Sequence, residues 1–207
     1  MSILLRLCLT TLLLLVALPD ARAAERLGDF TDGQVLQGRF VQLRQLSGFP
    51  APLKSEGRFI LVAGRGLIWQ AETPFAVTTV ISPAGLVQEA GGVETMRLPA
   101  ARLPFIARLY AMLGGALSGD WQGLEEAFTV AREGSDTAWN LRLLPRKAGD
   151  AAIPFREILI QGGQFADRVE IVKPDGDRDI LTFLDQRLSG QPLSAEDMQL
   201  LDMAGRR

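Results

Sequence analysis

The stretch Gly57–Pro74, GRFILVAGRGLIWQAETP, decides the fold of this chain. It holds two short apolar runs, at 58–62 and 67–70, and the segment Ala63-Gly64-Arg65-Gly66 joins them. Two such runs separated by a glycine-containing turn are the ordinary sequence pattern of a β-hairpin. The sequence therefore predicts two antiparallel strands here.

The second strand of this hairpin carries a large ring on one side. Because side chains alternate across a strand, Leu67 and Trp69 are predicted on one face and Ile68 and Gln70 on the other. The indole of Trp69 points either into a packed core or into an open apolar cavity, and the function depends on which of the two it is.

Further short strands flank the hairpin on both sides, and turns rich in Gly, Pro, Asp and Ser separate them. Such regular spacing predicts a meander in an antiparallel sheet rather than alternating βαβ units. The predicted fold class is α+β, with about eleven strands forming one strongly curved sheet. These strands are expected at 34–46, 53–62, 67–72, 75–81, 86–89, 93–98, 124–132, 137–144, 155–161, 165–173 and 178–184.

Two segments have the pattern of helices. Residues 99–117 carry apolar side chains at helical spacing over most of the circumference, which predicts a helix with apolar contacts on both sides. Ser194 is placed to cap a short helix that ends near Met203 and has Glu196 and Asp197 in its first turn.

The first 23 residues have the pattern of a secretory signal peptide. Arg6 precedes an apolar run, and Ala21-Arg22-Ala23 offers a cleavage site after Ala23. The alternative is an uncleaved anchor. We expect residues 24–207 to form one domain in the periplasm. Cys8 lies inside the leader, so the mature chain is expected to carry neither a disulfide nor a lipid anchor.

The residue inventory restricts the chemistry. Beyond residue 23 there are 20 basic and 23 acidic side chains, a net charge of −3 that gives no electrostatic footprint for nucleic acid. The chain has no histidine and the mature part no cysteine, which excludes nucleophile–histidine dyads and the usual zinc sites. Asp175, Asp177 and Asp179 imitate the start of a calcium loop but lack its Gly and Glu positions, so we expect a solvated turn, no metal and no cofactor.

Four pieces of the sequence, in this order, resemble the LolA-type periplasmic carriers of outer-membrane lipoproteins. The resemblance extends over roughly 35–184 and implies a half-open antiparallel barrel with a helical lid over a hydrophobic cavity. It also implies acylated cargo received from an inner-membrane ABC-type exporter and passed to an outer-membrane receptor. The four pieces are Gly38-Arg39-Phe40-Val41-Gln42, Ser55-Glu56-Gly57-Arg58-Phe59, Leu67-Ile68-Trp69 followed by Pro74, and Asp120-Trp121-Gln122.

The resemblance assigns roles to apolar residues that otherwise read as ordinary core. Leu67 and Trp69 would line the cavity. Phe105, Leu109, Tyr110 and Leu113 would belong to the lid. With them, the predicted ligand-binding set contains Phe40, Phe59, Leu61 and Trp139.

Two features differ from the family pattern. The arginine that ties the lid shut would stand at position 63, which is Ala63 here; Arg65, of the same strand parity, is the candidate replacement. The first helix of the family is shortened to 24–33. These differences suggest a divergent branch, with a glycolipid or an acylated pigment precursor as possible cargo instead of lipoproteins.

The resulting hypothesis is a monomeric, non-catalytic shuttle for an acylated lipoprotein or lipid. Two alternatives stay open: an enzyme that acts on an envelope lipid or glycan through carboxylates, and a structural assembly factor whose barrel is filled.

Overall fold

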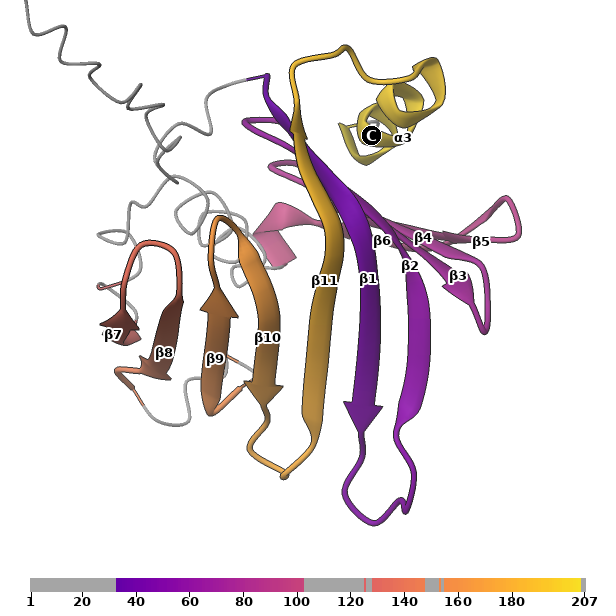
Figure 1. Cartoon of the computed structure of the whole chain (residues 1–207). Helices are drawn as coiled ribbons and strands as arrows, with labels where there is room; N and C mark the ends of the chain where they lie inside the picture. Colours follow the sequence, from indigo (N-terminus) through magenta and orange to yellow (C-terminus); the bar gives the residue numbers. More distant parts are fainter. Residues whose placement is uncertain (1–32, 103–124, 126–127, 148–152, 154, 206–207) are drawn as a thin grey trace, which may run out of the picture.

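A single antiparallel sheet dominates the computed structural model, which describes residues 33–102, 125, 128–147, 153 and 155–205. The strand order is β6-β5-β4-β3-β2-β1-β11-β10-β9-β8-β7 (Figure 1). The strands are β1 (Val35–Gln45), β2 (Leu53–Val62), β3 (Gly66–Thr73), β4 (Val77–Ser82), β5 (Gly85–Ala90), β6 (Val93–Pro99), β7 (Phe128–Gly134), β8 (Trp139–Pro145), β9 (Glu157–Gly162), β10 (Ala166–Val172) and β11 (Arg178–Ser189).

The pairing of β1 with β11 joins the two halves of the sheet. The strands β1 to β6 form one run of hairpins and β7 to β11 a second run. Phe40 on β1 lies opposite Phe183 on β11, so segments more than 140 residues apart meet at the centre. Among the described strands, β6 and β7 do not pair with each other, and the sheet stays open. Figure 1 shows β2 running beside β1, and β3 to β6 turning away from them.

One face of the sheet carries the odd-numbered side chains of β3, and we call it the Trp69 face. Its central cluster contains Leu36, Phe40, Phe59, Leu61 and Leu67, all at most 8% exposed. A second cluster covers β7 to β10 on the same face. Leu181 of β11 lies opposite Val169 of β10, Val169 lies opposite Ile160 of β9, and Ile160 lies opposite Leu141 of β8. Residues that lie opposite each other share a face, so this chain of partners extends the Trp69 face to β8. That second cluster is built on Phe128, Trp139, Leu141, Leu143, Ile153, Phe155, Ile158 and Ile160.

The opposite side of β1 to β5, which we call the Ile68 face, is covered by the helix α3 (Ala195–Gly205). Ile68 and Val80 are fully buried beneath it, and Leu201 and Ala204 supply the helix side of this cluster. Ser194 caps the helix, since its Oγ accepts a hydrogen bond from the Asp197 amide at 3.0 Å. Both predictions about this segment, the helix and its cap, are confirmed.

The predicted fold class, a curved and half-open antiparallel barrel of about eleven strands, is confirmed. All eleven strands are present, with shifted ends at several of them. Phe75 lies in the turn before β4, and β11 runs on to Ser189. The strand expected from 124 begins only at Phe128, and Glu125 is helical. In each case the sequence pattern located the element, and the boundary depended on pairing with neighbours.

The helix expected over 99–117 is described only at its start. Pro99 ends β6, and Ala100–Arg102 form the short 3-10 turn η2. The remainder of that helix, the short segment 24–32 and the leader at 1–23 lie outside the described residues, and their structures stay predictions. Within the described part of the chain, no helix combines the length and apolarity needed to span a membrane.

Candidate functional site

Five of the predicted ligand-binding residues come together on the Trp69 face. Phe40 from β1, Phe59 and Leu61 from β2, and Leu67 and Trp69 from β3 form the central cluster. Alternation places them together, because all five occupy positions of the same face in paired strands. Leu67 and Trp69 are on one face of β3 and Ile68 on the other, as the sequence predicts.

The rings in this cluster are stacked across strands. Phe40 and Trp69 lie with their ring centroids 3.7 Å apart at an interplanar angle of 23°. Phe59 stacks less closely on Trp69, with centroids 6.3 Å apart. Contacts between aromatic rings add to the stabilisation that burial of the rings gives.

Phe183 of β11 completes the cluster and was not among the predicted site residues. Its ring meets Phe59 edge-on at 5.3 Å and Trp69 edge-on at 6.2 Å. The alternation of Leu181 and Phe183 along the last predicted strand places both on one face. Sequence alone did not reveal that β11 pairs with β1, and that pairing brings Phe183 to the site.

Exposure divides the cluster into a floor and an accessible layer. Phe40, Phe59, Leu61 and Leu67 are buried, with at most 8% of their surface exposed. Trp69 and Phe183 are only partly buried, as are Ala71, Ile81 and Phe165 around them. An apolar ligand on this face would therefore contact Trp69 and Phe183 first.

Trp139 is not part of this cluster. It is the first residue of β8, is 3% exposed and packs in the second cluster. Its indole Nε1 donates a hydrogen bond to the Gly163 carbonyl oxygen at 2.7 Å, and a Cβ on Gly162 would lie 2.6 Å from its ring. The structure thus separates Trp139 from the other predicted site residues, although both clusters lie on the Trp69 face.

The predicted lid residues Phe105, Leu109, Tyr110 and Leu113 lie outside the described residues, so their assignment stays a prediction. The proposed lock, Arg65, is described. Ala63 and Arg65 both lie in the turn between β2 and β3, where strand parity does not apply. The Arg65 guanidinium forms an ion pair with Asp202 of α3 at 3.2 Å, and both side chains are largely exposed. The assignment of Arg65 as a lid lock stays a prediction.

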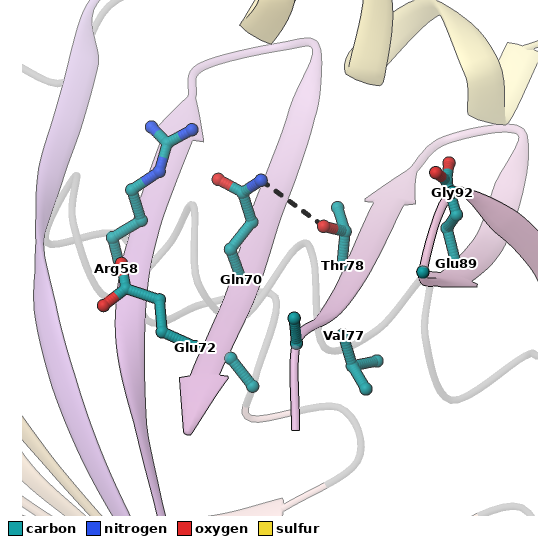
Figure 2. Close-up of a pocket in the computed structure, with 10 residues that line it drawn as sticks. Arg58, Gln70, Glu72, Val77, Thr78, Glu89 and Gly92 are labelled. Atoms are coloured by element: carbon teal, nitrogen blue, oxygen red, sulfur yellow. Dashed lines mark hydrogen bonds between the residues drawn. The ribbon is translucent and has the colours of Figure 1, made fainter. Parts of the chain in front are cut away.

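A second candidate site is a groove on the Ile68 face that contains several polar side chains and has a volume of about 390 Å³. Figure 2 shows Arg58, Gln70, Thr78 and Glu89 on the consecutive strands β2 to β5, and the register places each opposite the next. The groove is lined by Arg58, Gln70, Ala71, Glu72, Ala76, Val77, Thr78, Glu89, Gly91 and Gly92.

The groups in the groove differ in how well they are paired. Arg58 donates to Asp197 of α3 at 3.2 Å, and the Gln70 amide donates to the Thr78 hydroxyl at 3.3 Å. Within the described residues, Gln70 Oε1 is buried without a hydrogen-bond partner, and the Glu89 carboxylate has neither a hydrogen bond nor an ion pair. The groove therefore keeps unused acceptors beside a cation.

The aspartates that imitate a calcium loop are engaged in contacts with the protein. Asp179, 7% exposed, accepts from Arg44 at 2.8 Å and pairs with Lys173 at 2.9 Å. Burial acts to raise the pKa of Asp179, but the hydrogen bonds from Arg44 and Lys173 outweigh it and hold the pKa below its ordinary value. Asp177 accepts from the Ser47 amide at 2.8 Å. Among the described residues, no cluster of three or more His, Cys, Asp or Glu side chains is arranged to bind a metal ion.

Residues 21–184 match a protein family described as outer membrane lipoprotein carrier protein LolA-like. A comparison with curated protein sequences finds no significant match.

Among solved structures, the chain is similar to a LolA superfamily protein from Nitrosomonas europaea, with 11% identity over 78% of this chain and 88% of that chain and a TM-score of 0.42. It is similar also to an outer membrane lipoprotein-sorting protein domain from Vibrio parahaemolyticus, with 13% identity over 84% of this chain and 92% of that chain and a TM-score of 0.36. A third is MucB in complex with MucA, with 15% identity over 81% of this chain and 53% of that chain and a TM-score of 0.42.

Proposed function

The chain belongs to the family of outer membrane lipoprotein carrier protein LolA-like proteins, and from that premise we propose that it is a periplasmic carrier of acylated cargo. The proposed activity is the reversible burial of acyl chains against the Trp69 face during transfer from the inner to the outer membrane. The observation that carries the proposal is the aromatic cluster of Phe40, Phe59, Trp69 and Phe183.

The energetics of such a site follow from its composition. Moving acyl chain carbons from water onto apolar surface gains about 0.8 kcal/mol for each CH₂ that is fully buried. Trp69 and Phe183 are partly buried and rest on a floor of buried side chains, so they offer contact surface that is already ordered. A preordered surface loses little side-chain entropy on binding.

The described carboxylates favour a carrier over the alternative of a carboxylate enzyme. A general acid and base would need two carboxyl groups that converge on one substrate. On the Trp69 face, Asp179 is held by Arg44 and Lys173. Glu72 and Glu89 both line the groove on the opposite face, away from the aromatic cluster, and Glu72 is held in an ion pair with Arg39. The second alternative is a structural protein whose barrel is filled and binds no cargo. The experiment below distinguishes this protein from a carrier.

The partners follow from the same premise. We propose an inner-membrane ABC-type exporter as the donor of cargo and an outer-membrane receptor as the acceptor. The cargo would be a lipoprotein or, in a divergent branch, a lipid or glycolipid. The carrier would be a monomer that reaches the periplasm through the leader at 1–23.

The test is native mass spectrometry of the full chain, expressed with its own leader and purified from the periplasm. The carrier predicts a co-purifying acylated species, and a bare protein would favour the filled barrel. Loading with a synthetic triacylated lipopeptide then gives an affinity for each variant.

Three variants locate the site. Trp69→Glu and Phe183→Glu place a charge on the Trp69 face, and each is expected to weaken lipopeptide binding by more than about tenfold, because a carboxylate is costly to desolvate beside an acyl chain. Leu184→Glu adds the same charge one residue from Phe183, at a position that is 46% exposed and directed to the other face. It should bind as the wild type does. Normal binding by Trp69→Glu would count against a site at this face, provided that thermal unfolding shows all three variants folded.

A further inference from the structure

The four most exposed large apolar side chains among the described residues lie at one end of the sheet. Phe49 is 64% exposed, Leu53 59%, Phe75 76% and Val93 66%. They lie in or beside three alternate hairpin connections, β1–β2, β3–β4 and β5–β6. We call these four residues the apolar rim.

The register places these three connections at the same end. Glu56 near the start of β2 lies opposite Thr73 at the end of β3, and Val77 at the start of β4 lies opposite Ala90 at the end of β5. In Figure 1 the β1–β2 connection projects below the sheet, and the turns of the neighbouring hairpins follow along its right-hand side.

The opposite end of the same strands differs. Its connections, at 63–65 between β2 and β3 and at 83–84 between β4 and β5, carry no large exposed apolar side chain. Exposed apolar residues scattered singly over a surface need no explanation, but here the four most exposed large apolar side chains of the described residues all lie at one end, which indicates a contact surface.

The longest of these connections has a fixed base. The Ser47 amide donates to Asp177 of the β10–β11 turn at 2.8 Å, and the Phe49 amide donates to the Leu46 carbonyl oxygen at 3.1 Å. Arg44, at the end of β1, is tied to Asp179 of β11. The contacts hold the loop against the sheet while its tip, including Phe49, faces solvent.

Polar groups of both signs lie directly behind the rim. The groove on the Ile68 face reaches the two turns beside Phe75 and Val93, since Ala76, Gly91 and Gly92 line it. Its wall holds the guanidinium of Arg58, which pairs with Asp197, and the carboxylate of Glu89, which has no ion pair with any other residue that the structure describes. Apolar tips in front of mixed charges match the layering of a bilayer interface, where acyl chains lie beneath zwitterionic headgroups.

We propose that the apolar rim is a membrane-contact surface, which inserts reversibly into the interface of an electrically neutral, zwitterionic lipid bilayer. Charge argues for this type of surface. The mature chain has a net charge of −3 and the groove behind the rim holds both signs, so an anionic surface gains no attraction from the whole protein. Separate protruding tips can enter a deformable lipid interface individually, whereas a folded protein partner would need a continuous complementary surface.

The inference does not depend on cargo burial at the Trp69 face. Contact between the apolar rim and a bilayer would let the protein take up or release its cargo directly at the membrane surface.

The test is co-flotation of the purified mature chain with vesicles of phosphatidylcholine alone. The wild type is expected to float with the vesicles. The double variant Phe49→Ser/Phe75→Ser should lower the partition coefficient by about tenfold or more, because two exposed rings are lost from the contact. The matched control Leu184→Ser/Met198→Ser removes two exposed apolar side chains elsewhere and should partition as the wild type does.

A second measurement reports insertion at the tip. Phe75→Trp should show a blue shift of the added tryptophan emission when vesicles are present, and Met198→Trp should show none. Wild-type protein that stays unbound to phosphatidylcholine vesicles would overturn the proposal, and so would equal losses in the two double variants. Binding that needs anionic lipid and disappears at high salt would overturn it in favour of electrostatic docking. The affinity of Phe49→Ser/Phe75→Ser for the lipopeptide is measured as well. Normal lipopeptide binding together with lost vesicle binding would assign the defect to membrane contact and not to the carrier function.

Discussion

Phe40 and Trp69 stack at a centroid distance of 3.7 Å although the strand β2 runs between the strands that carry them. Neighbouring strands lie about 4.8 Å apart, so the Cα atoms of β1 and β3 are separated by about twice that distance. The position of β2 beside Phe40 is Gly57, whose other neighbour is Ala71 of β3. The rings can meet because no side chain stands between them.

The first prediction concerns Gly57. A Cβ there would lie 1.8 Å from the Gln70 carbonyl oxygen, so Gly57→Ala must push β3 away. We expect a loss of about 2–4 kcal/mol in the free energy of unfolding, measured by urea denaturation, together with altered tryptophan emission. Gly190→Ala is the matched control, because a Cβ at Gly190 meets nothing within 4 Å. Equal stability of both variants would refute the proposed close approach.

The second prediction concerns Asp179 and pH. Arg44 and Lys173 hold the pKa of Asp179 below its ordinary value of about 3.9, so the charged carboxylate stabilises the fold above that pH. As pH falls through the lowered pKa, the folded protein takes up the proton and this stabilisation is lost. Asp179→Asn should therefore cost about 2 kcal/mol at neutral pH, and its deficit should shrink in acid.

Urea denaturation of the wild type and Asp179→Asn over a series of acidic pH values checks this expectation. Asp136→Asn is the control, since that side chain is 97% exposed and its removal should not change stability at any of these pH values. If the loss of unfolding free energy in Asp179→Asn stayed the same down to strongly acidic pH, the carboxylate charge would not be the source of the stabilisation.

The third prediction separates the contacts that hold α3. Ser194→Ala removes the helix cap and should lower stability by about 1 kcal/mol. Arg65→Ala removes an ion pair between two largely exposed side chains and should cost less than about 0.5 kcal/mol. Thermal unfolding of the two variants gives the comparison. A larger effect for Arg65 than for Ser194 would mean that the arginine does more than pair with Asp202.

Local pattern was enough to predict the strands and the two faces of β3. Alternation alone assigned Leu67 and Trp69 to one face and Ile68 to the other, because the period of a strand leaves no other choice. The glycine turns located the hairpins, and Ser194 located the start of α3.

Long-range pairing accounts for what sequence did not provide. Phe183 reaches the site only through the pairing of β11 with β1, and Trp139 is kept away from it by a separate packing cluster. The sequence also gave no sign that α3 would cover Ile68. Which partner covers an apolar face depends on tertiary contacts, which the spacing within one segment does not encode.

The pairing of β1 with β11 has a consequence for how the chain folds. The strand at the centre of the sheet is the first to be made, and its partner on one side is the last. Pairing β1 with β11 requires closing a loop over most of the chain, which is slow. The local hairpins of β1 to β6 can form earlier, and until β11 pairs with it one edge of β1 has no partner strand. α3, which follows β11, covers the Ile68 face only after that. Folding of the sheet as one unit therefore begins only when the complete polypeptide has emerged, and a chain truncated before β11 would expose both an unpaired strand edge and an uncovered apolar face to aggregation.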